Sequence, residues 1–254
     1  MRHLLDRWKR IAGTGASFAL FGFGSLVIGL VVHPILRMAM RREDRERAVQ
    51  RAIHITFRWF QAFMESAGVI EVDAASAASL AGAPGRLLIA NHPTLLDYVL
   101  VVAQLPQADC VVKRSHWSNP FTAGVVRGAG YVPNDAGETT VAECARRLAA
   151  GRTLLLFPEG TRSPAGGLGV FERGAAHVAL LAACPTYPVA IRCEPRGLMR
   201  GQPWYDVPAS RMRFSFAVGA PIASETAEAS RGRAARKLTA RYRAHFEKEL
   251  GRSA

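Results

Sequence analysis

The sequence is short of cysteine and of acidic residues. Its four cysteines, in 254 residues, include no C-x-x-C pair, which argues against a zinc site and favours free thiols in a reducing compartment. The 20 Asp and Glu are outnumbered by 33 Lys and Arg, so the net charge is +13. This surplus predicts an anionic partner: nucleic acid, a phosphorylated substrate or an anionic membrane surface. No zinc-finger or RNA-recognition motif is found in the sequence, so we do not expect a nucleic-acid partner.

Charged residues are missing altogether from residues 11–36. Because about 20 apolar residues cross a bilayer core, we predict a retained N-terminal membrane segment within residues 1–43, either spanning or re-entrant. A cleaved signal peptide is the alternative, but the stretch is long for one and no A-x-A-like cleavage site is clear. Basic residues flank both ends, so the positive-inside rule gives no clean orientation.

Residues 44–73 are predicted to form an amphipathic helix with additional arginines. Its apolar residues recur at helical spacing, at Val49, Ile53, Phe57, Phe60, Phe63, Met64 and Ala67. Such a helix either docks on the core of the protein or lies at a membrane interface with its arginines at the lipid head groups. The sequence favours neither reading over the other.

Residues 74–222 are predicted to form an α/β core, and residues 223–254 a C-terminal amphipathic helix. The Ala-, Ser-, Gly- and Pro-rich stretch 74–85 is predicted as a loop. Alternating residues in 211–218 indicate an edge or half-buried strand. The pattern predicts a mixed β-sheet flanked by helices. The other predicted strands are 87–90, 110–113, 131–132, 153–157 and 187–192, and the predicted helices between them are 95–105, 122–128, 139–150 and 174–183.

The first functional motif is Asn91-His92-Pro93-Thr94-Leu95-Leu96-Asp97, directly after a predicted buried strand. A histidine with an ordinary pKa near neutrality suits general-base chemistry. An aspartate five residues later is placed to orient the imidazole and to stabilise its charged form. The competing interpretation of His92 is a structural histidine with satisfied hydrogen bonds.

The second motif is Phe157-Pro158-Glu159-Gly160-Thr161-Arg162-Ser163, also at the end of an apolar strand. Ligands of open α/β sheets bind at this edge. Gly160 permits close backbone approach, and Arg162 is suited to bidentate phosphate binding. Glu159 is a candidate to bind an acceptor hydroxyl or to orient the arginine; the alternative is a structural Glu–Arg pair.

Together, in this order and spacing, the two motifs resemble those of the glycerolipid acyltransferase family, the 1-acyl-glycerol-3-phosphate acyltransferases and their relatives. The resemblance runs over roughly residues 85–218. It implies that His92 and Asp97 are catalytic and that Glu159, Gly160, Thr161 and Arg162 bind the acceptor.

The same resemblance implies transfer of an acyl group from acyl-CoA or acyl carrier protein to a lysophospholipid-like acceptor. It implies no cofactor or metal, and phospholipids as partners. The expected location is the inner membrane, with the catalytic domain facing the cytoplasm.

One position departs from the family pattern. Members that use lysophosphatidic acid often carry an arginine where Asn134 stands, and Asp135 adds a charge unsuited to phosphate. Lys113, Arg114 and Arg127 are candidate substitutes, although each also suits a solvated or structural role. The acceptor therefore stays open among lysophosphatidic acid, other lysophospholipids, an ornithine lipid, and a glycolipid or polyene intermediate.

Three further assignments stay open. Trp117 and Phe121 are candidates to line an acyl channel or to belong to the core. A metal-dependent hydrolase with His92, Asp97 and Glu159 as ligands is a second enzyme class, although no further histidine lies near either motif. A lipid-binding protein without catalysis is the third possibility, against which the oriented base argues.

Overall fold

The computed structural model describes residues 2–82, 85–135, 137–224 and 230–251. Its strands are β1 Ile70–Val72, β2 Leu87–Ala90, β3 Asp109–Lys113, β4 Val132–Asn134, β5 Leu154–Leu156, β6 Thr186–Glu194 and β7 Met212–Val218. Its helices are α1 Arg2–Val27, the π-helical η1 Ile28–Val32, α2 His33–Ala39, α3 Arg42–Ser66, α4 Ala74–Ala78, α5 Asp97–Val102, the 3-10 helix η2 Arg114–Trp117, α6 Ala123–Gly128, α7 Glu138–Ala149, α8 Gly174–Ala182 and α9 Arg231–Gly251.

The strands form one mixed sheet in the order β1-β7-β6-β2-β5-β3-β4. The strands from β6 to β4 are parallel, whereas β7 runs antiparallel to β6 and carries β1 parallel to itself. This architecture confirms the predicted mixed sheet flanked by helices. Because β2 and β5 are adjacent and parallel, the two motifs that follow them begin side by side.

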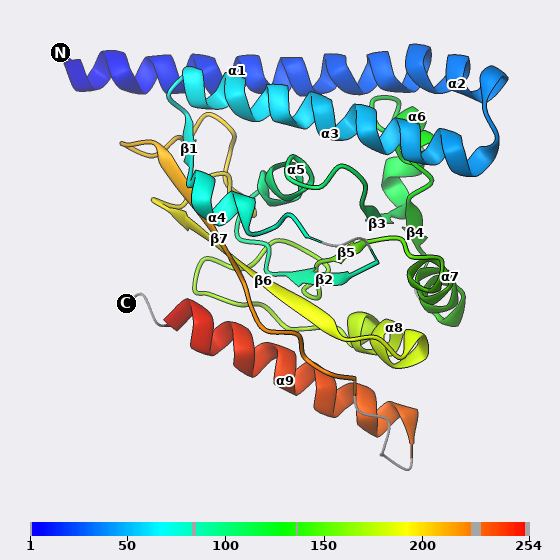
Figure 1. Cartoon of the computed structure of the whole chain (residues 1–254). Coiled ribbons are helices and arrows are strands. Elements are labelled where there is room, and N and C mark those ends of the chain that lie inside the picture. Colours follow the sequence, from blue (N-terminus) through cyan, green and yellow to red (C-terminus); the bar gives the residue numbers. More distant parts are fainter. Residues whose placement is uncertain (1, 83–84, 136, 225–229, 252–254) are drawn as a thin grey trace.

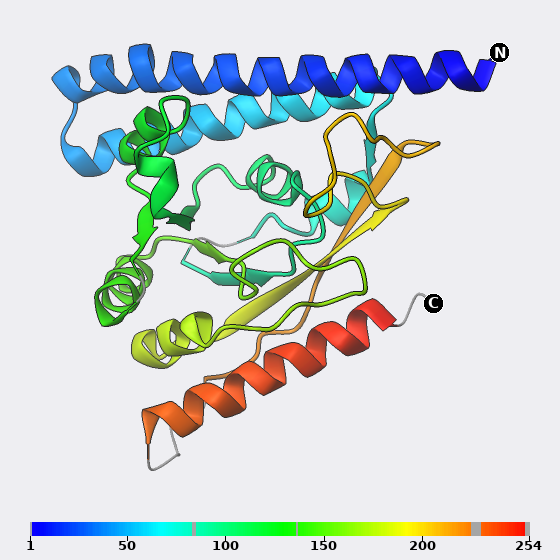
Figure 2. The same ribbon diagram turned by 180° about the vertical axis from the view of Figure 1, so that it is seen from behind.

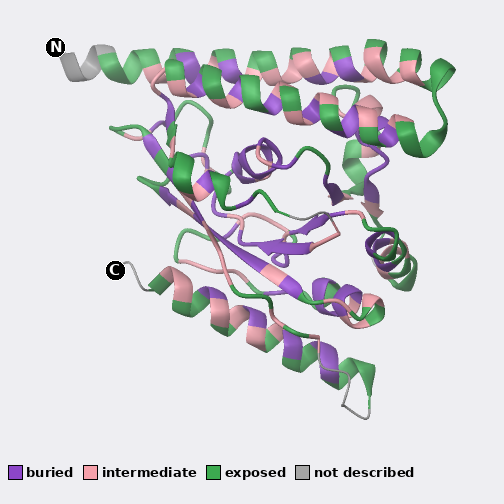
Figure 3. Ribbon diagram, viewed as in Figure 1, coloured by how far each residue is buried: buried purple, intermediate pink, exposed green. Residues whose placement is uncertain are grey.

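Helices cover both faces of the sheet (Figures 1 and 2). One face carries α5, over which α3 and the long N-terminal helix lie side by side. The other face carries α7, α8 and α9. Burial follows these layers, since the sheet and α5 are mostly buried while α1 and α9 expose many residues (Figure 3).

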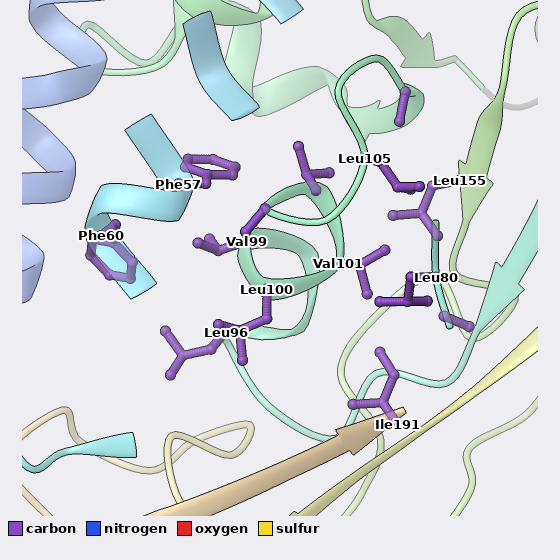
Figure 4. Close-up of a cluster of buried hydrophobic side chains, with 14 of the residues drawn as sticks. Phe57, Phe60, Leu80, Leu96, Val99, Leu100, Val101, Leu105, Leu155 and Ile191 are labelled. Carbon is purple, nitrogen blue, oxygen red and sulfur yellow. The ribbon is translucent and has the colours of Figure 1, made fainter. Parts of the chain in front are cut away.

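Helix α5 fills the space between the sheet and α3 (Figure 4). Val99, Leu100 and Val101 are at most 5% exposed, and they lie among Phe57 and Phe60 of α3 and residues of the sheet. Burying each such side chain contributes about 1.5–3 kcal/mol. The first residue of α5 is Asp97, so this packing fixes the carboxylate of the first motif.

Residues 6–39 form one helix that is long and apolar enough to cross a membrane, judged by length and composition alone. Its small residues face the protein: Gly13 approaches Val69, and Gly29 approaches Gly124. Phe21 and Ile28 pack toward the core, whereas many of the other large apolar residues face outward. The exposed ones are Leu20, Phe23, Val27, Leu30, Val31, Ile35 and Met38.

Helix α3 docks on the core, which is one of the two readings left open by the sequence, because Val49, Ile53 and Met64 are at most 1% exposed. Phe63 does not belong to the buried stripe as predicted, since it is 36% exposed. Trp59 is 75% exposed on the outer face. The membrane-interface reading of this helix stays a prediction.

The structure differs from the sequence prediction at α4 and at the strands β1 and β7. Residues 74–78 form α4 rather than a loop, because the Asp73 side chain caps it by accepting hydrogen bonds from the N–H groups of Ala75 (3.0 Å) and Ser76 (3.2 Å). β7 is half-buried as predicted but is not an edge strand, because β1 pairs with it outside. β1 falls in the region assigned to the amphipathic helix. The start of the predicted helix at residues 225–229 lies outside the described residues.

Candidate active site

The two motifs meet at the carboxyl ends of β2 and β5. The backbone N–H of His92 donates to Glu159 Oε1 at 3.1 Å, and the N–H of Ser163 donates to the His92 carbonyl at 2.7 Å. The His92 ring also stacks on Phe157, with centroids 4.4 Å apart. The motifs are 60 residues apart in sequence but form one site, as their position after adjacent strands predicts.

His92 and Asp97 form the hydrogen-bonded pair that the spacing predicts. His92 Nδ1 lies 2.8 Å from Asp97 Oδ2, the carboxylate is fully buried, and 19% of the histidine side chain is exposed. Thr94 also donates to both carboxylate oxygens, through its N–H at 2.7 Å and its hydroxyl at 2.7 Å. With both oxygens accepting, the pair is satisfied when Nδ1 carries a hydrogen, which leaves Nε2 as the basic nitrogen.

The surroundings of Asp97 change its pKa in two opposite directions. Burial raises the pKa of this carboxyl, while the hydrogen bonds from His92 and Thr94 partly offset that rise. A buried carboxylate with a titratable partner is typical of functional sites. The arrangement fixes the ring, and it favours a positive charge on the imidazole when Nε2 takes up a proton.

Glu159 is a buried acceptor that organises the backbone of the site. Its side chain accepts hydrogen bonds from His92 N–H, from the Ser163 hydroxyl at 2.6 Å and from Gly169 N–H at 2.7 Å. It is 6% exposed. These donors differ from both predicted partners, an acceptor hydroxyl and Arg162. Glu159 therefore positions the segment that carries His92.

Arg162 contacts the long loop between β6 and β7. Its guanidinium Nη1 donates to the carbonyls of Leu198 (3.0 Å) and Met199 (2.8 Å). Leu95 N–H donates to the same Leu198 carbonyl. The guanidinium fork keeps further N–H donors for a ligand. Gly160 is exposed and adopts φ +62°, and Thr161 is half-exposed beside it.

The loop that Arg162 contacts, residues 195–211, also reaches the N-terminal helix. Arg10 donates to the carbonyls of Pro208 (3.2 Å) and Ala209 (2.6 Å). Trp204 packs edge-on against Phe18, with centroids 6.4 Å apart. The loop therefore bridges the second motif and α1.

The three proposed substitutes for the family arginine lie in different places. Lys113 is the last residue of β3 and pairs with Asn134 of β4. The structure therefore places a cation beside the position where the sequence differs from the family pattern. Arg114 is paired with Asp135 at 2.9 Å. Arg127 lies on α6, donates to the Trp117 carbonyl and faces another cavity.

Sequence reasoning missed several positioning residues. Asn91 is bound to β6 by two hydrogen bonds. Its side chain accepts one from the Ile191 N–H (2.7 Å) and donates one to the Ile191 carbonyl (2.9 Å). Thr94 and Ser163 hold the two carboxylates. The signal for them was their place inside the motifs, but their partners depend on contacts that no spacing rule gives.

The four cysteines lie outside the two motifs. All four cysteines are free, and burial raises the pKa of Cys110 and Cys193 to about 12, which suits inert core thiols. Among the described residues, no group of three or more His, Cys, Asp or Glu is placed to hold a metal ion.

Comparisons with known proteins find a matching family model, a similar sequence and a similar fold. Residues 79–192, a little under half of the chain, match the family model described as Acyltransferase. The chain is 26% identical over 147 residues to the 1-acyl-sn-glycerol-3-phosphate acyltransferase of Helicobacter pylori (strain J99). That match covers 56% of this chain and 57% of the relative.

A solved structure shares the fold over nearly the whole chain. It is the crystal structure of the 1-acyl-sn-glycerophosphate acyltransferase PlsC from Thermotoga maritima. The TM-score is 0.68 with 19% identity, and the match covers 97% of this chain and 99% of that one.

Proposed function

We propose that the protein moves a fatty acyl group from a thioester to the hydroxyl of a lysophospholipid-like acceptor, because residues 79–192 match the family model described as Acyltransferase. The observation that carries this proposal is the His92–Asp97 pair, with Nε2 of the ring as the basic nitrogen at the ligand-binding edge of the sheet. The activity named for the Helicobacter pylori relative favours lysophosphatidic acid as acceptor and phosphatidic acid as product.

The proposed chemistry needs one base and no protein nucleophile. His92 Nε2 takes the proton of the acceptor hydroxyl as its oxygen attacks the thioester carbonyl carbon. The new C–O bond forms, the C–S bond then breaks, and the leaving thiolate takes the proton back from Nε2. Asp97 holds the ring and stabilises its transient positive charge. A thioester is already activated, so we propose acyl-CoA or acyl carrier protein as co-substrate and no cofactor.

The acceptor phosphate is proposed to bind between Arg162 and Lys113. Lys113 is the last residue of β3 and Arg162 follows β5, two strands parallel to β2, and Arg162 retains N–H donors beyond its two loop contacts. Arg162→Ala should raise KM for a phosphorylated acceptor more than it lowers kcat. An equal effect on a phosphate-free acceptor would refute phosphate binding by this residue.

A membrane location is proposed from the outward-facing apolar surface of the N-terminal helix. Packing through small residues, with large apolar ones exposed, suits a lipid environment. We propose the inner membrane, with the catalytic domain on the cytoplasmic side, where acyl-CoA and acyl carrier protein are found and where free cysteines persist.

A phosphate-free acceptor, such as an ornithine lipid or a glycolipid, is the second candidate. Asn134 favours it because an amide replaces a cation, and the Arg114–Asp135 pair neutralises a further positive charge nearby. A panel of acceptors separates the two candidates.

The test uses detergent-purified protein, labelled acyl-CoA and acyl carrier protein thioesters, and lysophosphatidic acid, other lysophospholipids and a lyso-ornithine lipid as acceptors. His92→Ala should abolish transfer. His177→Ala, on α8 and outside the site, is the matched control and should retain it. Retained turnover in His92→Ala would remove His92 from the base role. Loss of activity with EDTA would instead favour the metal-dependent hydrolase.

A further inference from the structure

A cavity of about 750 Å³ lies near the amino ends of the parallel strands β4 and β5, whereas His92 follows the carboxyl end of β2. We call it the arginine cavity; its walls are the first turns of α3, strand β4 with the preceding Arg127, and the end of α7. Arg152, which lines it, comes just before β5, whereas Glu159 follows the other end of that strand. Its volume is that of a typical small-ligand site.

The lining of the arginine cavity has a positive excess. Seven arginines and three glutamates line it. Within the described residues, four of the arginines (Arg42, Arg146, Arg147 and Arg152) form ion pairs with carboxylates. Arg45, Arg47 and Arg127 have no carboxylate within 4.0 Å in the part of the chain that the structure describes. These three are the charges available to an anion.

A buried ionic network holds the wall of the arginine cavity rigidly. Asp109 accepts hydrogen bonds from Arg147 (2.8 Å), Arg152 (2.6 Å) and Gln50 (2.9 Å). Arg152 reaches Glu46 at 2.9 Å, so α3 is tied to the sheet. Side chains that are already held in place lose little conformational entropy when a ligand binds.

Two buried donors of the lining lack an acceptor among the described residues. They are Arg45 Nε and Trp117 Nε1. Leaving a buried donor unpaired costs about 1–3 kcal/mol, so such groups usually have a partner. The oxygens of an anion are the kind of acceptor that such donors require.

The position of the arginine cavity selects the kind of anion. Arg42 and Arg45 are in the first turn of α3, which begins shortly after the apolar helix ends at Ala39. Basic residues directly after a membrane segment meet the phosphates of anionic lipids. We propose that the arginine cavity binds the phosphate group of an anionic phospholipid, at a site separate from the acceptor site. The proposal does not depend on acyl transfer.

The test measures binding to the full-length protein in detergent. The probe is dihexanoyl phosphatidylglycerol, and the comparison ligands are dihexanoyl phosphatidylcholine, inorganic phosphate and CoA. Arg47→Gln combined with Arg127→Gln removes two exposed charges and should weaken phosphatidylglycerol binding about tenfold or more. The matched control combines Arg233→Gln with Arg236→Gln, two exposed positions on α9, and should leave the affinity unchanged.

A second variant keeps the charge. Trp117→Phe removes only the unpaired indole donor and should weaken binding severalfold. Unfolding temperatures without ligand verify that each variant is folded, and His92→Ala should bind phosphatidylglycerol as the wild type does. Equal loss in the cavity pair and the α9 pair, or no loss in either, would overturn the proposal. Binding of CoA or inorganic phosphate as tight as phosphatidylglycerol, with the same dependence on Arg47 and Arg127, would overturn the lipid assignment.

Discussion

A buried aspartate lies near each end of the parallel strands, Asp97 beyond the carboxyl end of β2 and Asp109 at the amino end of β3. These two aspartates differ in their partners. Asp97 is 0% exposed and hydrogen-bonds to His92 and Thr94. Asp109 is 1% exposed and is bound by two arginines and Gln50. Histidine can lose its charge at neutral pH, whereas arginine cannot. The comparison teaches that partners, rather than burial, separate a carboxylate suited to catalysis from one suited to holding elements together.

The largest difference should appear in activity. Asp97→Asn no longer stabilises the Nδ1–H tautomer, so we expect kcat to fall about 10³–10⁴-fold. Steady-state transfer assays measure this, with Asp206→Asn, an exposed loop position, as the control. Removing the buried charge offsets the loss of one acceptor oxygen, so we expect Asp97→Asn to remain folded at neutral pH. A stable variant with full activity would show that Asp97 is not needed to orient the base.

The opposite pattern is expected for Asp109. Asp109→Ala leaves Arg147, which is 4% exposed, without its buried carboxylate partner. Breaking a buried ion pair from one side costs about 3–5 kcal/mol of unfolding free energy. Denaturant unfolding in detergent measures the change, and Asp206→Ala should alter it by less than about 1 kcal/mol. A loss for Asp109→Ala as small as that of the control would mean that the network contributes little.

Two glycines with positive φ allow a finer comparison of the two ends of the strands. Gly130, at the arginine cavity, has φ +65°, and an added Cβ would lie 2.2 Å from the Glu46 carboxyl carbon. Gly160, in the second motif, has φ +62° with open space around that position. We expect Gly130→Ala to cost about 2–3 kcal/mol and Gly160→Ala about 1 kcal/mol. Equal costs would mean that backbone conformation alone decides both.

The smallest effect concerns pH. Burial raises the pKa of Asp97 above its ordinary value of 3.8, so the folded protein binds this proton more tightly than the unfolded one. The contribution of Asp97 to stability is therefore most favourable below that ordinary value and declines as the pH rises through the folded pKa. Asp97→Asn has no such decline. Its unfolding temperature should gain on that of the wild type as the pH rises above the ordinary value of 3.8 and through the folded pKa. A pH-independent difference would contradict the raised pKa.

The sequence predicted the contact between His92 and Asp97 much better than the contacts of Asp109. His92 and Asp97 are five residues apart after a recognisable apolar strand, so local pattern was enough. Asp109 meets partners 59 and 38 residues away in sequence, Gln50 and Arg147, and only the folded chain brings them together.

Short elements were missed for a similar reason. β1 has three residues, and it exists as a strand only because β7, far along the chain, pairs with it. The predicted roles of Glu159 and Arg162 were incomplete because their partners, the His92 backbone and the Leu198 carbonyl, come from other segments.

The loop of residues 195–211 has a mechanical consequence. It is tied to Arg162 at the Leu198 carbonyl and to Arg10 at the Pro208 carbonyl. A shift of α1 by one helical turn, about 5.4 Å, would break the second tie or pull on the first. With α1 in the bilayer as we propose, the depth of that helix fixes the height of His92 above the lipid surface. We therefore expect the rate of the proposed transfer to depend on the thickness of the surrounding bilayer.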